Sequence, residues 1–308
     1  MNNHSFVFKQ PKYLVGYATW HINIENNFYT FFDELTVNCC FDPKNYVLVL
    51  PFLQNFTTDY FEIDVYNLAI AIANKLASFH NALKLSNPKV EKYAKTNVLT
   101  QEPLYLHLLN QLKQGYGRNY FLDEVVFPSF TNPQIELYRS ILHDFVNSDI
   151  LRSNLFDFST EWNSDTLIHG DLKTQNIFKY KNGVEFIDFE FVSIGDKTWD
   201  IACIVESFLH DTPIKNHPEK SAIFFKALID TYCDIQKLDL ESKKVVYKKI
   251  MKFWAMRIID KWRTKTLKYI SNDVFRKNIN RAKLLLTETE TYIKLILENA
   301  PERYQLFS

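Results

Sequence analysis

The alternation of apolar and polar positions predicts β-strands in the N-terminal part of the chain. Residues 46–53 form the clearest strand, because they are β-branched and apolar and because Pro51 ends strand pairing. A shorter run, 6–10, also predicts a strand. Between the two, apolar residues at helical spacing predict a helix over 22–35. The N-terminal part is therefore expected to contain a small sheet and one helix.

Helical periodicity dominates the rest of the chain. An amphipathic helix is predicted over 66–83, with Leu68, Ile72 and Leu76 on one face. Further helices are predicted over 135–155, 199–209, 219–237, 241–265 and 272–299. Residues 85–133 are polar and irregular, and we interpret them as a helical insertion whose role the sequence does not reveal. Together the elements predict an α+β protein.

A polar loop near the middle of the chain lies between two apolar runs. Residues 167–177 begin as an apolar strand and continue into polar positions, and 184–190 form a second apolar strand that ends in charged residues. The two segments place Asp171, Asn176 and Asp188 at fixed spacing. Loops held by rigid strands position reactive side chains well. We therefore interpret these three side chains as the candidate site.

The chemistry that requires this set of side chains is phosphoryl transfer. An attacking hydroxyl needs a carboxylate that orients it and accepts its proton, and Asp171 offers one. Asn176 and Asp188 offer hard oxygen ligands for Mg²⁺. Kinases place the base and the metal-binding asparagine five residues apart, as here, with a second aspartate on a following strand. The spacing therefore predicts that ATP and Mg²⁺ are used.

At these positions the sequence resembles the aminoglycoside phosphotransferase and choline kinase-like family, which are small-molecule kinases with the protein-kinase fold. The resemblance rests on three motifs: His169-Gly170-Asp171-x4-Asn176, Ile187-Asp188-Phe189-Glu190, and Gly195-Asp196-x3-Asp200-Ile201-Ala202. It implies a protein-kinase-like two-lobe fold. Residues 1–54 would form a reduced N-terminal β lobe with the hinge, and 55–308 a large, mostly helical catalytic and acceptor-binding lobe.

The resemblance also implies a role for each side chain of the candidate site. Asp171 is the expected base. Lys173 stands where protein kinases carry a lysine near the γ-phosphate, whereas many antibiotic kinases have histidine there. Asn176 and Asp188 are the expected metal ligands. Glu190 replaces the glycine of the usual D-x-G motif, as in choline and methylthioribose kinase-like sequences, and is expected beside the metal.

By the same resemblance, the N-terminal residues bind the nucleotide. Lys9 is expected to reach the α- and β-phosphates and to pair with Glu25, with Glu34 as the reserve partner. Backbone groups around Leu50 and Phe52 are expected to form the hinge that hydrogen-bonds adenine. The alternative is that Lys9 is one surface lysine among many and that Glu25 is a first-turn residue favoured by the helix dipole.

The glycine-rich hairpin that covers the phosphates in this fold is missing from the sequence before Lys9. Eight residues precede Lys9, and none of them is glycine. Either the natural start lies upstream or the small lobe is reduced. This departure supports a competing hypothesis, that the protein is a catalytically inactive kinase fold with a binding or scaffolding role. A serine or threonine of a small peptide is a second candidate acceptor.

Two further polar residues are interpreted as structural. His80 is expected to be a hydrogen-bonded core histidine, because no second metal ligand lies at helical spacing beside it. Asp200 is expected to cap the helix at 199–209. The resemblance adds that Asp200 braces the catalytic loop rather than touching substrate.

A basic run over 241–268 contains ten Lys or Arg and two acids. Such a run is usually a solvated helix face. However, Arg257 lies on or beside the apolar stripe that includes Ile250 and Phe253. An arginine in that position is predicted to point into the cleft, where this family builds its acceptor pocket from late helices. We hypothesise that Arg257 or its neighbours contact an anionic acceptor.

Composition narrows the classes of partner. Lys plus Arg equals Asp plus Glu at 36 each, so no overall field favours nucleic acid or acidic membranes. No stretch approaches transmembrane length, and the polar start does not resemble a signal peptide. Four cysteines lack metal-ligand spacing and are expected to be reduced thiols. We expect a cytoplasmic protein acting on a small-molecule hydroxyl acceptor, with no nucleic-acid or membrane partner; the sequence carries no signal of oligomeric state.

Overall fold

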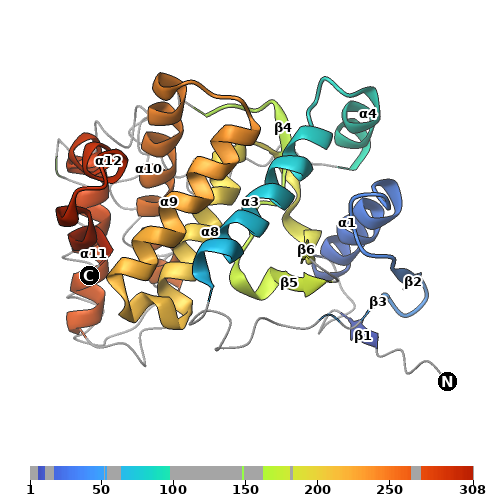
Figure 1. Ribbon diagram of the computed structural model, residues 1–308. Coiled ribbons are helices and arrows are strands. Elements are labelled where there is room, and N and C mark those ends of the chain that lie inside the picture. Colours follow the sequence, from blue (N-terminus) through green and yellow to red (C-terminus); the bar gives the residue numbers. More distant parts are fainter. Residues whose placement is uncertain are drawn as a thin grey trace.

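The protein is described by a computed structural model in which a small sheet with one helix lies at one end and a helix-rich body at the other (Figure 1). The structure describes residues 6–10, 17–51, 53, 64–97, 148, 162–180, 183–264 and 272–307. The predicted helix at 135–155 and the predicted domain boundary at 54/55 lie outside the described residues, apart from residue 148.

The small sheet has three antiparallel strands in the order β1-β3-β2. Strand β1 is Phe6–Lys9, β2 is Cys40–Asp42 and β3 is Val47–Pro51. The predicted strand at 46–53 is therefore confirmed but shorter. Tyr46 adopts a left-handed backbone with φ 52°, so it belongs to the turn between β2 and β3 rather than to the strand.

Helix α1 spans Tyr17–Phe31, so the prediction of 22–35 placed this helix several residues too late. The chain leaves the helix at Phe32, which is buried, and continues into a turn. The apolar side chains that suggested continued helix therefore pack on the core from a turn. As a result Glu25 is not a first-turn residue. It lies in the middle of α1 and is fully buried.

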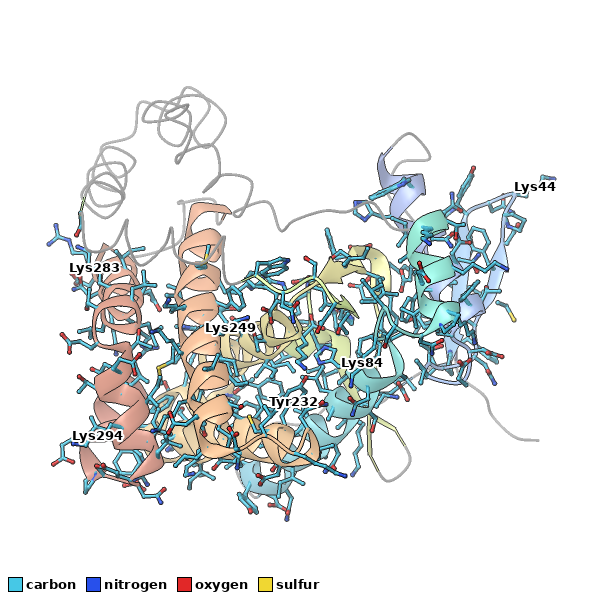
Figure 2. All side chains as sticks on the ribbon, turned by 90° about the horizontal axis from the view of Figure 1, so that it is seen from above. Lys44, Lys84, Tyr232, Lys249, Lys283 and Lys294 are labelled. Carbon is cyan, nitrogen blue, oxygen red and sulfur yellow. The ribbon has the colours of Figure 1, made fainter. Side chains whose placement is uncertain are left out.

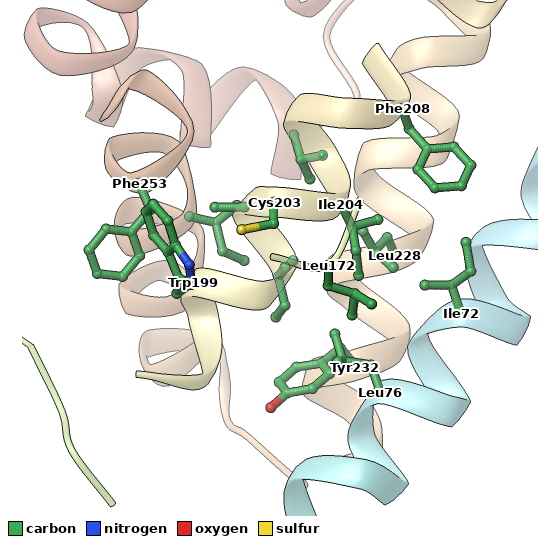
Figure 3. Close-up of a cluster of buried hydrophobic side chains, with 14 of the residues drawn as sticks. Ile72, Leu76, Leu172, Trp199, Cys203, Ile204, Phe208, Leu228, Tyr232 and Phe253 are labelled. Atoms are coloured by element: carbon green, nitrogen blue, oxygen red, sulfur yellow. The ribbon is translucent and has the colours of Figure 1, made fainter. Parts of the chain in front are cut away.

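Four helices form the main core. They are α3 (Val65–Ala82), α8 (Lys197–Asp211), α9 (Pro218–Ile235) and α10 (Leu240–Thr264). Figure 3 shows how α3 lies against α9, with α8 between them and α10. Helix α8 is buried on nearly every side, as expected for a central helix. Burying each large apolar side chain here contributes about 1.5–3 kcal/mol of transfer free energy.

Two strand pairs hold the polar loops against this core. Strand β4 (Thr166–Ile168) pairs antiparallel with β7 (Ser193–Gly195). Strand β5 (Ile177–Tyr180) pairs antiparallel with β6 (Gly183–Phe186). The loops that follow β4 and β6 therefore start from short, rigid elements.

Two predictions made for other helices need correction. The segment 272–299 is not one helix but α11 (Asn272–Thr287) and α12 (Thr289–Leu297). The hydroxyls of Thr287 and Thr289 bond to carbonyls four residues earlier, at 3.0 Å and 2.5 Å, and such bonds bend helices. The start of the supposedly irregular region also contains a helix, α4 (Pro88–Asn97).

Seen from above, α11 and α12 form an outer layer, with Lys283 and Lys294 pointing outward and Tyr232 pointing into the core (Figure 2). A short 3₁₀ helix, Pro301–Phe307, packs on α9 and α12. All four cysteines are free thiols. Among the helices that the structure describes, each is too short or too polar to cross a bilayer.

Candidate active site

The loop after β4 requires glycine at its first turn. Gly170 has φ +85°, a conformation that L side chains rarely adopt. A Cβ built on Gly170 would lie 2.4 Å from the carbonyl oxygen of Phe191. The indole N–H of Trp199 donates to the Gly170 carbonyl at 2.8 Å. The loop is thus pressed against the Phe189–Phe191 turn and held from α8.

A buried carboxylate holds the same loop from below. Asp200 accepts hydrogen bonds from the backbone N–H of His169 at 2.8 Å and of Gly170 at 2.9 Å. Its Oδ2 also contacts Nε2 of His80 at 3.0 Å, and the other ring nitrogen of His80 lies 2.9 Å from the Tyr232 hydroxyl. The prediction that His80 is a satisfied core histidine is confirmed.

The cap of α8 was assigned to the wrong residue. Asp196, not Asp200, precedes the helix, and its side chain accepts from the backbone N–H of Thr198 at 2.9 Å. Asp200 lies in the first turn and faces the loop after β4. The sequence could not separate the two aspartates, because both residues occur near a plausible helix start.

Both carboxylate oxygens of Asp171 face cations. Lys173 Nζ lies 2.5 Å from Oδ2, and Arg257 Nη2 from α10 lies 3.3 Å from Oδ1. The side-chain amide of Asn176 donates to the Asp171 backbone carbonyl at 2.9 Å. Asp171 remains partly open, with 18% of its side chain exposed. A carboxylate in such a position can meet a substrate hydroxyl.

Backbone pairing brings Asp188 beside Asn176. The β5–β6 hairpin pairs Ile177 with Phe186, and the Ile187 N–H donates to the Asn176 carbonyl at 3.1 Å. The His169 ring then contacts the Ile187 carbonyl at 2.9 Å. Asp188 is the next residue along the chain. The segments that carry Asp171, Asn176 and Asp188 therefore lie side by side.

Lys9, the last residue of β1 in the small sheet, contacts Asp188. Lys9 Nζ contacts Glu25 at 2.5 Å and Glu190 at 3.2 Å, and it also bonds to Asp188. The predicted Lys9–Glu25 pair is thus present in the structure. Glu34, the reserve partner, instead pairs with Lys89 on α4.

The charges of this cluster are set by burial and by one another. Burial works against the charge on Lys9, but the carboxylates of Glu25 and Asp188 outweigh it and raise the pKa of Lys9. Burial raises the pKa of Glu25 to about 7, against the opposing effect of the Lys9 charge. The lysine therefore stays protonated at neutral pH, while Glu25 is held close to its titration point.

The donor set around Lys9 fits a magnesium ion. Oxygens of Glu25, Asp188 and Glu190 lie within 4.8 Å of one another, and Asn176, whose backbone carbonyl bonds to the Ile187 N–H, directly precedes β5. Hard oxygen ligands of this type are what Mg²⁺ binds. Three carboxylates outnumber the one ammonium among them, so added positive charge is favourable.

Two residues of α1 belong to the site although the sequence reading did not name them. The Tyr29 hydroxyl accepts from the Asp188 backbone N–H at 3.3 Å, and His21 Nδ1 contacts the Glu190 carbonyl at 3.1 Å. Both lie one helical turn from Glu25 and so share its face. Reading that face as a unit would have found them.

The predicted adenine hinge is only partly within the described residues. Leu50 lies in β3 opposite Val7, and its side chain is buried. Phe52 lies outside the described residues. A role of these two positions in binding adenine stays a prediction.

Replacing Gly170 with alanine is expected to lower the free energy of unfolding by about 2 kcal/mol or more, since it adds a steric clash to an unfavourable backbone conformation. Chemical denaturation measures the change. Gly183→Ala is the matched control, because nothing lies within 4 Å of a Cβ built there. Equal losses in the two variants would contradict the close contact between Gly170 and Phe191.

Comparisons with known proteins were made for both sequence and structure. No protein-family model matches the sequence. A curated relative, a LicA homolog from Mycoplasma capricolum subsp. capricolum, is 26% identical over 153 residues. The match covers 48% of this chain and only 58% of that protein, less than two thirds of its length.

Solved structures match over nearly the whole chain. An ethanolamine kinase from Plasmodium vivax has a TM-score of 0.54 and 17% identity, with 92% of this chain and 77% of that chain covered. A choline kinase from Cryptosporidium parvum has a TM-score of 0.52 and 15% identity, with 98% and 86% covered. The GDP complex of aminoglycoside 2′-phosphotransferase-IIIa has a TM-score of 0.51 and 16% identity, with 94% and 87% covered.

These likenesses establish the fold. The chain has the α+β, protein-kinase-like architecture shared by choline and ethanolamine kinases and aminoglycoside phosphotransferases, with a small sheet and a large helical part. The resemblance read from the sequence motifs is confirmed at this level.

Proposed function

We propose that this protein is an ATP- and Mg²⁺-dependent phosphotransferase that moves the γ-phosphate to a hydroxyl group of a small molecule. One observation carries the proposal: hydrogen bonds join the segments of Asp171, Asn176 and Asp188, and Lys9 contacts both Glu25 and Asp188. Each side chain belongs to a different step of phosphoryl transfer, and each is present with the required chemistry. The structural neighbours named as kinases and phosphotransferases support the same class of reaction.

The reacting groups have separate roles. Asp171 accepts the proton of the acceptor hydroxyl while the hydroxyl oxygen attacks the γ-phosphorus and the bond to the bridging oxygen of ADP breaks. Lys173, whose ammonium lies 2.5 Å from Asp171, neutralises negative charge on the transferred phosphoryl group. The buried Asp200 keeps the loop in place through two backbone N–H groups and does not touch substrate.

The nucleotide is held from the opposite side. Lys9 contacts the α- and β-phosphates, and Glu25 orients it from α1. Asn176, Asp188 and Glu190 hold Mg²⁺, which when bound neutralises the phosphate oxygens and orients them for transfer. Leu50 and Phe52 mark the hinge segment proposed to hydrogen-bond adenine.

The test is transfer of labelled γ-phosphate from ATP. In the presence of Mg²⁺ and a set of small alcohols, we expect ADP and a labelled, phosphorylated alcohol to form together. Chelation of Mg²⁺ serves as the control and should stop the reaction, because without the metal the carboxylates of the site and the phosphates repel each other. A protein that neither forms ADP nor gains thermal stability from Mg²⁺-ATP would instead be an inactive kinase fold with a binding role.

A further inference from the structure

Arg257 brings a positive charge next to Asp171, the residue proposed to meet the acceptor hydroxyl. It lies on α10, and its Nη2 is 3.3 Å from Oδ1 of Asp171, although 86 positions separate the two residues. Only 18% of the Arg257 side chain is exposed. Asp171 Oδ2 faces Lys173, so Arg257 occupies the other side of the base. An acceptor hydroxyl that approaches Oδ1 therefore comes within reach of the guanidinium.

Aromatic packing fixes the position of this guanidinium. Its central carbon lies 5.4 Å from the centre of the Trp199 ring, a cation–π contact. Trp199 is itself held by its hydrogen bond to the Gly170 carbonyl and by Phe253, whose ring centre is 5.8 Å away. Figure 3 shows the Trp199 and Phe253 rings side by side between α8 and α10. An arginine that is already ordered loses little entropy when it binds a ligand.

The described side chains in contact with the Asp171 carboxylate are both cations, while the buried carboxylate of Asp200 holds the loop through backbone N–H groups. Lys173 and Arg257 contribute two positive charges against the single carboxylate of Asp171. Asp196, another acidic side chain of this region, is paired at 2.8 Å with Lys249, which lies two turns before Arg257 on α10. The carboxylates of Asp188, Glu25 and Glu190 instead surround Lys9, in the cluster proposed to bind the metal. A cationic acceptor beside Asp171 would meet repulsion from Arg257.

We propose that Arg257 is an acceptor-binding residue that selects an alcohol carrying an anionic group, a carboxylate or a phosphate, close to the hydroxyl that is phosphorylated. The proposal rests on the phosphotransferase function proposed above and specifies its acceptor class. A guanidinium offers five N–H donors in a planar fork that matches carboxylate and phosphate oxygens. This separates the chain from its structural neighbours, whose names include the cationic alcohols choline and ethanolamine.

The alternative is that Arg257 only positions Asp171. The two roles differ in what they predict for kinetics. A positioning residue would change kcat by the same factor for every acceptor. An acceptor-binding residue changes the KM for anionic acceptors and leaves cationic ones unaffected or improved.

Four small alcohols test the proposal: glycolate and glycerol phosphate as anions, and ethanolamine and choline as cations. In Mg²⁺-ATP, we expect the anions to give a kcat/KM at least about tenfold higher than the cations. Arg257→Gln should raise the KM for the anions at least about tenfold, Arg257→Lys should restore part of it, and Arg257→Glu should reverse the preference. Lys244→Gln is the matched control on the same helix, because its side chain is exposed and pairs with Glu241 near the start of α10.

Acceptor-free ADP formation and stabilisation by Mg²⁺-ATP are measured in the same samples, and they report on the phosphotransferase function alone. If both are present but the cations equal or exceed the anions, including the case in which neither class stimulates turnover, the acceptor proposal is overturned while the function stands. Equal kcat losses for all four alcohols in Arg257→Gln would also overturn it. Absence of both ADP formation and stabilisation would reject the function itself.

Discussion

Replacing Asp171 with asparagine is expected to slow phosphate transfer by at least about a hundredfold, because a general base contributes on this order. Asparagine keeps the size of the side chain, and its single carbonyl oxygen can still accept from either Lys173 or Arg257. It cannot take a proton from the acceptor hydroxyl, and it removes the negative charge that both cations now face. Mg²⁺-ATP binding should survive, because other residues are proposed to bind the phosphates and the metal.

The measurement is the initial rate of ADP formation with saturating Mg²⁺-ATP, with and without an acceptor alcohol. Asp33→Asn, on the exposed turn after α1, is the control for the change of chemistry and charge. It should behave as the unmodified protein does. Unchanged turnover in Asp171→Asn would show that this carboxylate is not the base.

Replacing Asp188 with asparagine is expected to weaken Mg²⁺-ATP binding at least about tenfold to a hundredfold, the range found even for groups that support metal ligands. Asparagine is the better choice than alanine, because Asp188 has φ 71° and asparagine tolerates this left-handed conformation. The variant therefore removes the charge without adding backbone strain. It also removes one carboxylate from the cluster around Lys9, which lowers the affinity for a divalent cation.

Thermal stability with and without ligand separates this effect from general damage. At a ligand concentration one hundred times Kd, binding should add about 2.7 kcal/mol to the free energy of unfolding. We expect this gain in the original protein and in Asp171→Asn, and about half of it or less in Asp188→Asn at the same concentration, because the weaker Kd leaves the ligand at about one to ten times Kd. If Asp188→Asn gained as much as the original protein, Asp188 would not belong to the metal site.

Local features of the candidate site could be read from the sequence because neighbouring residues encode them. The interval of five positions from Asp171 to Asn176, and a hairpin before Asp188, fix a loop and a turn whatever surrounds them. Helices α3 and α9 follow from apolar periodicity, with ends close to those predicted. The sequence did not predict where α1 ends, since the buried turn after it carries the same apolar pattern as a helix. It also did not predict the break at Glu288, since a helix bent by threonines has the same pattern as a straight one.

Contacts between distant segments were decided by the tertiary structure. The bond from Lys9 to Asp188 joins residues 179 positions apart, and the contact of Arg257 with Asp171 joins two that are 86 apart. Periodicity says which face of a helix is buried, but it does not say which loop that face meets. Phe253 of α10 packs on Trp199 of α8, and Arg257, one turn further along α10, contacts Asp171. The sequence by itself determined the reactive groups and their local geometry; packing between helices and strands determined which charges surround them, because electrostatic effects depend on distance in space.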